Sequence, residues 1–224
     1  MVVAVVPLKN LSQAKSRLAP LLSDLERRNL VVAMLGDVLA ALKQAKGLSE
    51  IFVVADGLGD RLDGVSLILE VENRGYDEAV AAALADPRVF GAEAMLVLPG
   101  DLPMVRPGDI EAFIGKFSCK ESKIGKLVGP TVRIAPARDG DGTNALLLAP
   151  PGLMASQFGP GSFARHRAAA EALISTVEIS APPGLAFDID TPQDLLDFCA
   201  RDDDTGTHDF LRRSGVVDRL TRAG

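Results

Sequence analysis

The chain has 224 residues, 47% of them hydrophobic, and its 30 acidic against 24 basic side chains leave a net charge of −6 at pH 7. This length suits one sizeable α/β domain and is short for two, and the apolar content supplies a full core without disulfides or metals. A nucleic-acid-binding protein is normally basic and stacks aromatic rings on bases, so the acidic balance, the single tyrosine and the absence of tryptophan argue against that class.

The first half of the chain alternates short apolar runs with helical patterns. Ser23 and Glu26 have the spacing of a capping box at the start of a long helix. Four apolar residues then recur at helical spacing: Leu30, Met34, Val38 and Leu42. Strands are predicted over 2–6, 51–55, 65–69 and 94–98, and further helices over 76–85 and 107–117.

After residue 117 the pattern changes to short strands and glycine-rich turns. Strands are expected near 127–128, 133–135, 145–148, 177 and 187, and helices over 162–173 and from Thr191-Pro192 onward. The alternation predicts an α/β fold, with a mostly parallel central sheet and helices on both faces. We expect one domain over 1–200 and a charged C-terminal extension over 201–224, with a weak amphipathic stretch over 210–220, that packs on this domain or on a second subunit.

No feature of the sequence indicates secretion or a membrane. The apolar run over 2–6 is too short to cross a bilayer and lacks the basic start of a signal peptide. The two cysteines, Cys119 and Cys199, have no metal-ligand or redox spacing, which fits a reducing compartment. We therefore expect a cytoplasmic protein.

The loop after the first strand is locally basic. It contains Lys9, Lys15 and Arg17, and it lies at the edge of an α/β sheet where ligands bind. Lysine acts on phosphates as a point charge and arginine as a planar fork, so a polyphosphate tail suits this loop. An ordinary solvated loop is the alternative. A Walker phosphate loop is excluded because its glycines are missing.

A carboxylate follows the buried strand near residue 98. The apolar run ends in Pro99, Gly100 and Asp101, which places Asp101 at the carboxyl end of a strand. A carboxylate there can hold a divalent metal on the phosphates of a nucleotide. The alternative is a turn aspartate that caps the helix beginning near Pro107.

The first of two glycine-rich turns covers 139–145. Its glycines let the backbone approach a ligand, and Thr143 and Asn144 offer hydrogen bonds to an acid or a phosphate. A plain hairpin turn is the alternative.

The second glycine-rich turn, over 158–163, runs into a helix. Free amides after the paired glycines of this turn, the hydroxyl of Ser162 and the helix N-terminus together make an anion site. A simple serine cap would explain Ser162 but not the paired glycines. His166 follows, and a single histidine in this place is more often a packing residue than a catalyst.

Two further carboxylates stand close together near the C-terminal end of the domain. In a strand, Asp188 and Asp190 would point the same way and present both carboxylates to a cation. Thr191 before Pro192 has the pattern of a helix start, and the alternative is that one aspartate serves only that turn.

Two sets of carboxylates, a basic loop and an anion-binding turn favour metal-assisted transfer of a nucleotidyl group. No Ser-His-Asp arrangement and no activated cysteine is recognisable. A phosphate acceptor has a second pKa of about 6. It is therefore already nucleophilic at pH 7 and needs no general base. Positioning and charge neutralisation would then supply the catalysis.

Five segments occur together, in the order in which a known family carries them. They are 7–9 with 14–18, 100–103, 142–145, 159–163 with His166, and 188–192. Over residues 2–198 the chain resembles the 2-phospho-L-lactate guanylyltransferase family, whose bacterial members act on phosphoenolpyruvate or 3-phospho-D-glycerate.

The resemblance implies a nucleotidyltransferase fold related to glycosyltransferase-A domains. It also implies Mg²⁺-dependent attack of the substrate phosphate on the α-phosphorus of GTP, with release of pyrophosphate. The product would be a guanosine-diphospho acid used to build a deazaflavin coenzyme. A homodimer and a hand-off of the product to the next enzyme of that pathway agree with this interpretation.

Carried over position by position, the resemblance also implies the site residues. The phosphorylated acid would be held by Thr143, Asn144, Gly159 and Ser162. The metal would be held by Asp101 with Asp188 or Asp190. The nucleotide would be contacted by Pro7, Leu8, Lys9, Lys15 and Asp77. The catalytic residues would be Asp101, Lys15 and Arg17.

The chain departs from its relatives at two positions. Asp77 stands where relatives often have an asparagine, and a carboxylate cannot donate the hydrogen bond that an amide can give to a nucleotide. Asp141 stands where relatives often have glycine, and its charge would favour an acid with an extra hydroxyl over a bare enol. Two alternatives remain open: a related nucleotidyltransferase with another nucleotide or acceptor, and a non-catalytic nucleotide-binding subunit.

Overall fold

The protein is described by a computed structural model over residues 1–8, 15–56, 63–69, 75–115, 129–173, 177–201 and 203–223. The strands are β1 (Val2–Pro7), β2 (Leu48–Ala55), β3 (Ser66–Leu69), β4 (Ala94–Val97), β5 (Thr131–Pro136), β6 (Thr143–Ala149) and β7 (Val177–Ile179). The helices are α1 (Asp24–Gln44), α2 (Tyr76–Leu84), α3 (Pro87–Phe90), α4 (Pro107–Ile114), α5 (Ser162–Leu173), α6 (Pro192–Cys199), α7 (Gly206–Arg213) and α8 (Val216–Ala223). Two 3₁₀ turns accompany them, η1 (Ser16–Leu18) and η4 (Pro183–Leu185).

Within these described ranges the strands form one sheet of seven, in the order β3-β2-β1-β4-β6-β5-β7. β1 pairs in parallel with β2 and β4, β2 with β3, and β5 with β7. β6 runs antiparallel to both of its neighbours, β4 and β5. The predicted α/β class with a mostly parallel sheet is confirmed.

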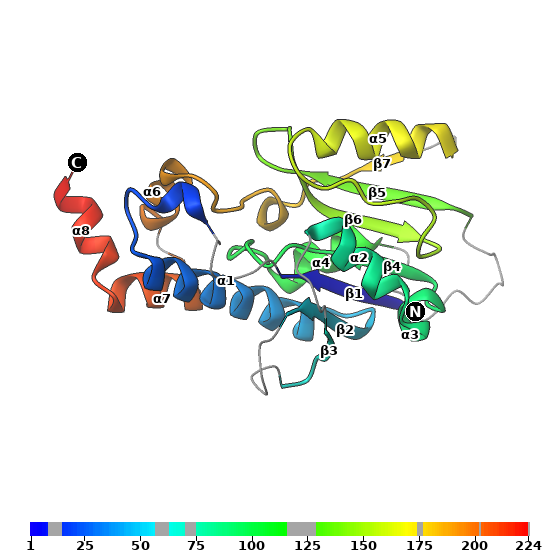
Figure 1. The fold of residues 1–224 in the computed structure, drawn as a ribbon, viewed down its shortest axis with the longest axis horizontal. Coiled ribbons are helices and arrows are strands. Elements are labelled where there is room, and N and C mark those ends of the chain that lie inside the picture. The colour runs from blue at the N-terminus through cyan, green and yellow to red at the C-terminus, as the bar shows by residue number, and fades with distance from the viewer. Residues whose placement is uncertain are drawn as a thin grey trace.

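Helices cover both faces of the sheet, as expected. One apolar layer packs the sheet against α1, α4, α6 and α7, and the other packs it against α2, α3 and α5. In Figure 1, α1 and α7 lie side by side, and α5 lies next to β5 and β7. The strand residues between these layers are almost fully buried, which agrees with the continuous apolar runs in the sequence.

The longest helix, α1, begins where its local sequence predicts. The Ser23 N–H donates to the Glu26 carboxylate at 2.8 Å and the Glu26 N–H donates to the Ser23 hydroxyl at 3.4 Å, which is the reciprocal capping box. The four residues predicted to share one face are all buried: Leu30, Met34, Val38 and Leu42.

The strand predicted near Phe187 is wrong, and the strand predicted over 127–128 lies outside the described residues. Residues 187–190 are irregular, although Phe187 and Ile189 are buried and the alternating Asp188 and Asp190 are half-buried. The alternation of apolar and acidic residues therefore predicts correctly which side chains are buried, although no strand forms. A strand also needs a neighbouring backbone to pair with, and here η4 ends just before the segment and α6 begins just after it.

The charged residues after 200 form two helices, α7 and α8, separated by Gly215 with φ 69°. The Asp37 carboxylate on α1 accepts hydrogen bonds from the backbone N–H groups of Gly206 at 2.7 Å and of Thr207 at 2.9 Å. Leu211 and Val216 are fully buried in the same core as α1. These helices thus pack on the chain's own α1, whereas contact with a second subunit and the boundary at residue 200 stay predictions.

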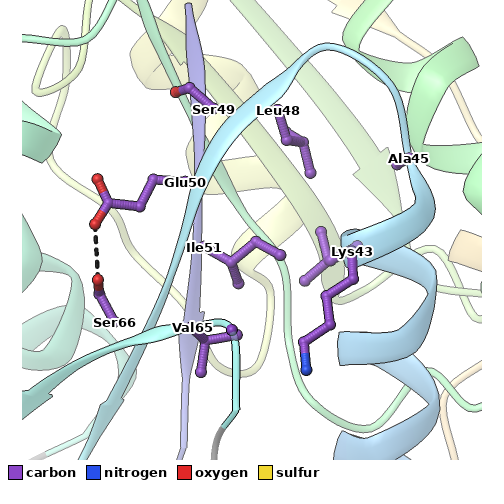
Figure 2. A pocket seen from close by; sticks show the side chains of 10 residues that line it. Lys43, Ala45, Leu48, Ser49, Glu50, Ile51, Val65 and Ser66 are labelled. Atoms are coloured by element: carbon purple, nitrogen blue, oxygen red, sulfur yellow. Dashed lines mark hydrogen bonds between the residues drawn. The ribbon is translucent and has the colours of Figure 1, made fainter.

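A cavity of about 430 Å³ lies beside the end of α1, the first half of β2 and the start of β3. Figure 2 shows Lys43, Ile51 and Val65 around this space, with Glu50 hydrogen-bonded to Ser66 beside it. The cavity borders the amino-terminal half of β2, away from the carboxyl ends of the strands where ligands bind in such sheets. Among the described residues, no helix is long and apolar enough to cross a membrane, and a cytoplasmic location stays a prediction.

Candidate active site

The candidate site lies where the strand order changes direction. From β1 the chain proceeds to β2 and β3 on one side, while β4 pairs with β1 on the other side. Such a switch point leaves a crevice beyond the carboxyl ends of the two strands. Pro7 ends β1, and the buried Leu8 donates its N–H to the carbonyl of Val54 at 2.9 Å. Lys15 follows β1 and Asp101 follows β4, so both belong to this edge.

Asp101 is not the cap of the following helix. The first turn of α4 is capped by Asp109, whose carboxylate accepts the Arg106 N–H at 2.9 Å. The alternative interpretation of Asp101 as a turn aspartate for this helix is therefore wrong. Its carboxylate instead accepts a hydrogen bond from the ammonium of Lys15 at 2.7 Å.

The ammonium of Lys15 joins two carboxylates that are far apart in the sequence, Asp101 and Asp190. It lies 2.7 Å from Asp101 and 2.5 Å from Asp190, and the Lys15 side chain is only 8% exposed. Burial alone would lower the pKa of Lys15, but the charges of Asp101 and Asp190 raise it above its ordinary value. The Lys15 backbone has φ 52°, which is uncommon for a residue with a side chain and is often found at functional sites.

Asp188 lies beside this pair and is held by an amide. The Asn144 side chain donates to Asp188 at 3.2 Å, although Asp188 and Asp190 are not in a strand. Burial and the negative charge of Asp101 raise the pKa of Asp188 to about 6. Burial also raises the pKa of Tyr76, with Asp101 and Asp190 as the next causes. With three carboxylates near one ammonium, the cluster carries excess negative charge.

This charge arrangement fits a divalent cation. Two carboxylates converge on one cationic group, and carboxylate oxygens are the ligands that Mg²⁺ and Mn²⁺ prefer. In the part of the chain that the structure describes, no group of three or more His, Cys, Asp or Glu side chains is already arranged around one metal position. Neither aspartate serves only the turn before α6, because that turn is capped by Asp194 and Thr191.

On the other side of Asn144, Thr143 belongs to a second cluster. Its hydroxyl lies 3.0 Å from Nδ1 of His166 on α5. The register between β5 and β6 shifts here, with Ala135 opposite Ala145 but Pro136 opposite Thr143. Such a bulge turns a side chain away from the strict alternation of a strand. The turn over 139–142 is thus the hairpin considered as an alternative, and it also places Thr143 and Asn144 in the two clusters.

The glycine-rich turn before α5 uses most of its amides internally. The N–H groups of Phe158 and Gly161 donate to the carboxylates of Asp77 at 2.9 Å and Asp141 at 2.8 Å. Among the described residues, the N–H of Gly159 and the hydroxyl of Ser162 have no hydrogen-bond partner. The expectation of several free amides is therefore wrong, because two aspartates and His166 accept hydrogen bonds from this segment. Gly159 is exposed and its N–H can meet an anion, whereas Ser162 is only 1% exposed.

The remaining predicted residues differ in their surroundings. Arg17 is exposed and makes no hydrogen bond or ion pair within the described ranges, so its guanidinium is available to a ligand. Lys9 lies outside the described residues. Asp77 contacts the turn before α5. Burial raises the pKa of the Cys199 thiol to about 11, which makes a nucleophilic thiolate there unfavourable.

The model of the family described as guanylyl transferase CofC like matches residues 2–223. The chain belongs to this family. The resemblance seen in the sequence is thereby confirmed, and the match continues through α7 and into α8.

Curated relatives of this CofC-like chain agree with one another. The phosphoenolpyruvate guanylyltransferase of Conexibacter woesei is 38% identical over 197 residues, which cover 86% of this chain and 84% of the relative. Other relatives, from Rubrobacter, Sphaerobacter and Roseiflexus species among others, are 32–38% identical and carry the same name.

Solved structures share the fold of this CofC-like chain. A protein from Desulfovibrio desulfuricans, named after the nucleotide-diphospho-sugar transferases, superposes with a TM-score of 0.67 at 15% identity and covers 98% of this chain and 97% of its own. The manganese complex of Rv0371C from Mycobacterium tuberculosis superposes with a TM-score of 0.53 at 20% identity, over 88% of this chain and 96% of its own.

Two residues of the site were missed by sequence reasoning. His166 was interpreted as a packing residue, yet it contacts Thr143 directly. Tyr76 lies close enough to the three aspartates for their charges to shift its pKa. The position of His166 four residues after Ser162, on the same face of a helix, is the signal that connects it to the anion-binding turn.

Proposed function

We propose that this CofC-like protein is a guanylyltransferase that transfers GMP from GTP to the phosphate of a small phosphorylated carboxylic acid and releases pyrophosphate. The observation that carries the proposal is the convergence of Lys15, Asp101 and Asp190 at the switch point between β1 and β4. The names of the curated relatives support phosphoenolpyruvate as the acceptor. 3-Phospho-D-glycerate and 2-phospho-L-lactate have the same recognisable groups and are the other candidates.

The proposed reaction needs charge neutralisation more than proton transfer. An oxygen of the acceptor phosphate forms a bond to the α-phosphorus of GTP, and the bond from that phosphorus to the bridging oxygen of pyrophosphate breaks. The acceptor oxygen is already ionised at neutral pH, since the second pKa of a phosphate group is about 6. The chain's contribution is then to hold two highly charged substrates in line and to balance their negative charge.

Asp101 and Asp190 are the residues that would hold a divalent cation, with Asp188 beside them. The bound ion would neutralise triphosphate charge and orient it, and Mg²⁺ is the ion that we propose. The manganese complex of the structurally similar Rv0371C supports the use of a divalent metal. Lys15 would move its ammonium from the carboxylates to a phosphate oxygen, which keeps the same charges close together.

The two substrates are assigned to two neighbouring parts of the site, the β1 edge and the cluster around Thr143. We propose that GTP contacts the β1 edge, through Pro7, Leu8, Lys9, Lys15 and Arg17, and that Asp77 borders its pocket. The phosphorylated acid is assigned to Thr143, Asn144, Gly159 and Ser162. The unpartnered N–H of Gly159 and hydroxyl of Ser162 support this assignment, since both can donate to an anion.

The biological context proposed from the family is the construction of a deazaflavin coenzyme. The guanosine-diphospho acid would be the product that the next enzyme consumes. A homodimer and a direct hand-off between the two enzymes are part of the same proposal and rest on the family resemblance alone.

The test is pyrophosphate release from GTP and Mg²⁺ with each of the three acids in separate reactions. We expect release with one acid and a loss of at least about 100-fold in Asp101→Asn, because the variant removes a carboxylate that would hold the divalent cation on the triphosphate. Asp209→Asn is the matched control, since Asp209 lies on α7 and, among the residues that the structure describes, forms an ion pair only with the nearby Arg213 at 3.3 Å.

The other outcomes separate the alternatives. Release only when GTP is replaced by another nucleotide would overturn the guanine assignment and direct attention to Asp77. No release with any nucleotide would favour the non-catalytic nucleotide-binding subunit. Equal activity of Asp101→Asn and Asp209→Asn would contradict the proposed site.

A further inference from the structure

His166 is buried and is held by hydrogen bonds at both ring nitrogens. Its Nε2 lies 2.7 Å from the backbone nitrogen of Gln157, and its Nδ1 lies 3.0 Å from the hydroxyl oxygen of Thr143. The imidazole has no exposed surface. The ring of Phe158 packs against it edge-on, with centroids 5.0 Å apart and planes at 74°.

The backbone of Gln157 determines which nitrogen carries the proton. A peptide N–H can only donate, so Nε2 must be the acceptor and carries no hydrogen. A neutral imidazole has one N–H, and it must therefore be on Nδ1. Burial lowers the pKa of His166 to about 4, with the charge of Asp77 acting against this and that of Arg165 adding to it, so the ring is neutral at pH 7.

The same reasoning continues to Thr143. Because Nδ1–H donates to the Thr143 hydroxyl, the oxygen of that hydroxyl is already an acceptor. The hydroxyl proton must then point to a different group. Within the described residues the Thr143 hydroxyl has no second partner. Ser162, whose hydroxyl also has no partner there, is the first residue of the helix that carries His166.

We infer that His166 is a positioning residue that fixes the Thr143 hydroxyl as a donor toward an ionised oxygen of the phosphorylated acid. This inference rests on the proposed function, because the acid is the ligand assigned to Thr143. It adds a rule of specificity: the substrate group at Thr143 must be able to accept a hydrogen bond, as a carboxylate or phosphate oxygen can. A group that can only donate would leave the proton of the Thr143 hydroxyl without a partner.

The competing interpretation is that His166 only anchors the turn. Its bond to the Gln157 N–H connects α5 to the segment that precedes Gly159. A structural anchor needs the acceptor at Nε2, whereas orientation of Thr143 needs the donor at Nδ1. Two isosteric substitutions separate these needs, because asparagine places an amide donor near Nδ1 and glutamine places a carbonyl acceptor near Nε2.

The first experiment measures the tautomer directly in the intact protein without substrates. A long-range ¹H–¹⁵N correlation spectrum at pH 7 should show His166 protonated at Nδ1, with its resonances identified by their loss in His166→Asn. An Nε2-protonated or doubly protonated ring would overturn the inference, whatever the enzymatic activity.

The second experiment compares KM values of the variants for the acid and for GTP. His166→Gln should raise KM for the acid about tenfold, as should Thr143→Val, while His166→Asn should raise it clearly less. KM for GTP should change little in all three. The double variant His166→Gln/Thr143→Val should be no worse than Thr143→Val, since both remove one interaction.

The reverse order, with His166→Asn worse than His166→Gln, would show that the anchor alone matters and would overturn the inference. Thermal unfolding of each variant identifies any loss caused by misfolding. If both histidine variants unfold, two other measurements test the inference. One is the tautomer of His166 in the wild type, and the other compares KM for the acid in Thr143→Ser, which keeps the hydroxyl, with that in Thr143→Val, which lacks it. An Nδ1-protonated ring in a protein that uses none of the acids would overturn the proposed function, and the ligand assignment with it, while the geometry of His166 would stand.

Discussion

At the scale of single residues, the main feature is a cation enclosed by carboxylates. Lys15, whose side chain is buried, neutralises Asp101 and Asp190 where the two nearby carboxylates would otherwise repel each other. Because Asp188 is also close, the cluster is left with more acid than base. A second cation can therefore enter without leaving an unbalanced positive charge.

Lys15→Met should show, through the stability of the folded protein, whether Lys15 and a divalent cation compete for the same carboxylates. The variant leaves Asp101 and Asp190 without their partner, so its unfolding temperature should fall, and Mn²⁺ should raise it by more than in the wild type, because a ligand that binds only the folded state stabilises it. The measurement is thermal unfolding over a series of Mn²⁺ concentrations. Lys43→Met, at the exposed end of α1, is the control. An equal Mn²⁺ effect in both variants would contradict the competition.

At the scale of elements, close backbone contacts hold the site edge in shape. η4 passes directly over the start of α4, and a Cβ on Gly184 would lie 2.7 Å from the carbonyl oxygen of Met104 and 2.8 Å from Cα of Val105. The segment 187–190, which carries two of the aspartates, follows this crossing immediately. The position of these aspartates therefore depends on the absence of a side chain at residue 184.

Gly184→Ala should destabilise the protein by about 1–3 kcal/mol, because backbone atoms cannot move aside as a flexible side chain can. Gly108→Ala is the matched control on α4, where an added Cβ meets nothing within 4 Å, and a helical alanine should be neutral or stabilising there. Urea unfolding of both variants gives the comparison. Similar stability of the two would show that the crossing tolerates a Cβ.

The elements also show what could be predicted from the sequence. The capping boxes at Ser23 and Thr191 are local signals and mark their helices correctly. The strand near Phe187 failed because strand formation requires a neighbour that local sequence does not report. The bulge at Thr143 was not predictable, since it depends on the register between two strands. The position of Asp101 at the end of a buried strand was predictable, but its contact with Lys15 was not.

At the scale of the whole molecule, buried titratable groups make stability depend on pH. His166 has a folded-state pKa of about 4, below the ordinary value of 6.5. The unfolded chain therefore binds more protons between these values, and the folded state loses stability as pH falls through this window. Asp188 acts in the opposite direction, because its raised pKa of about 6 favours proton binding by the folded state.

The difference between wild type and His166→Asn isolates the histidine, since asparagine does not titrate. The free energy of unfolding of the wild type, relative to this variant, should be smaller at pH 4 than at pH 7 by up to about 3 kcal/mol. Urea unfolding of both proteins at several pH values gives the measurement. Parallel pH curves would mean that His166 is not buried in its neutral form.

The bond between Lys15 and Asp190 spans 175 residues of chain. Closing so long a loop is entropically costly and happens late, once the intervening strands and helices are in place. During synthesis, the ribosome must release almost the entire domain before these two residues can meet. Nascent chains therefore lack the contact between Lys15 and Asp190, and the proposed site is completed only with the finished fold.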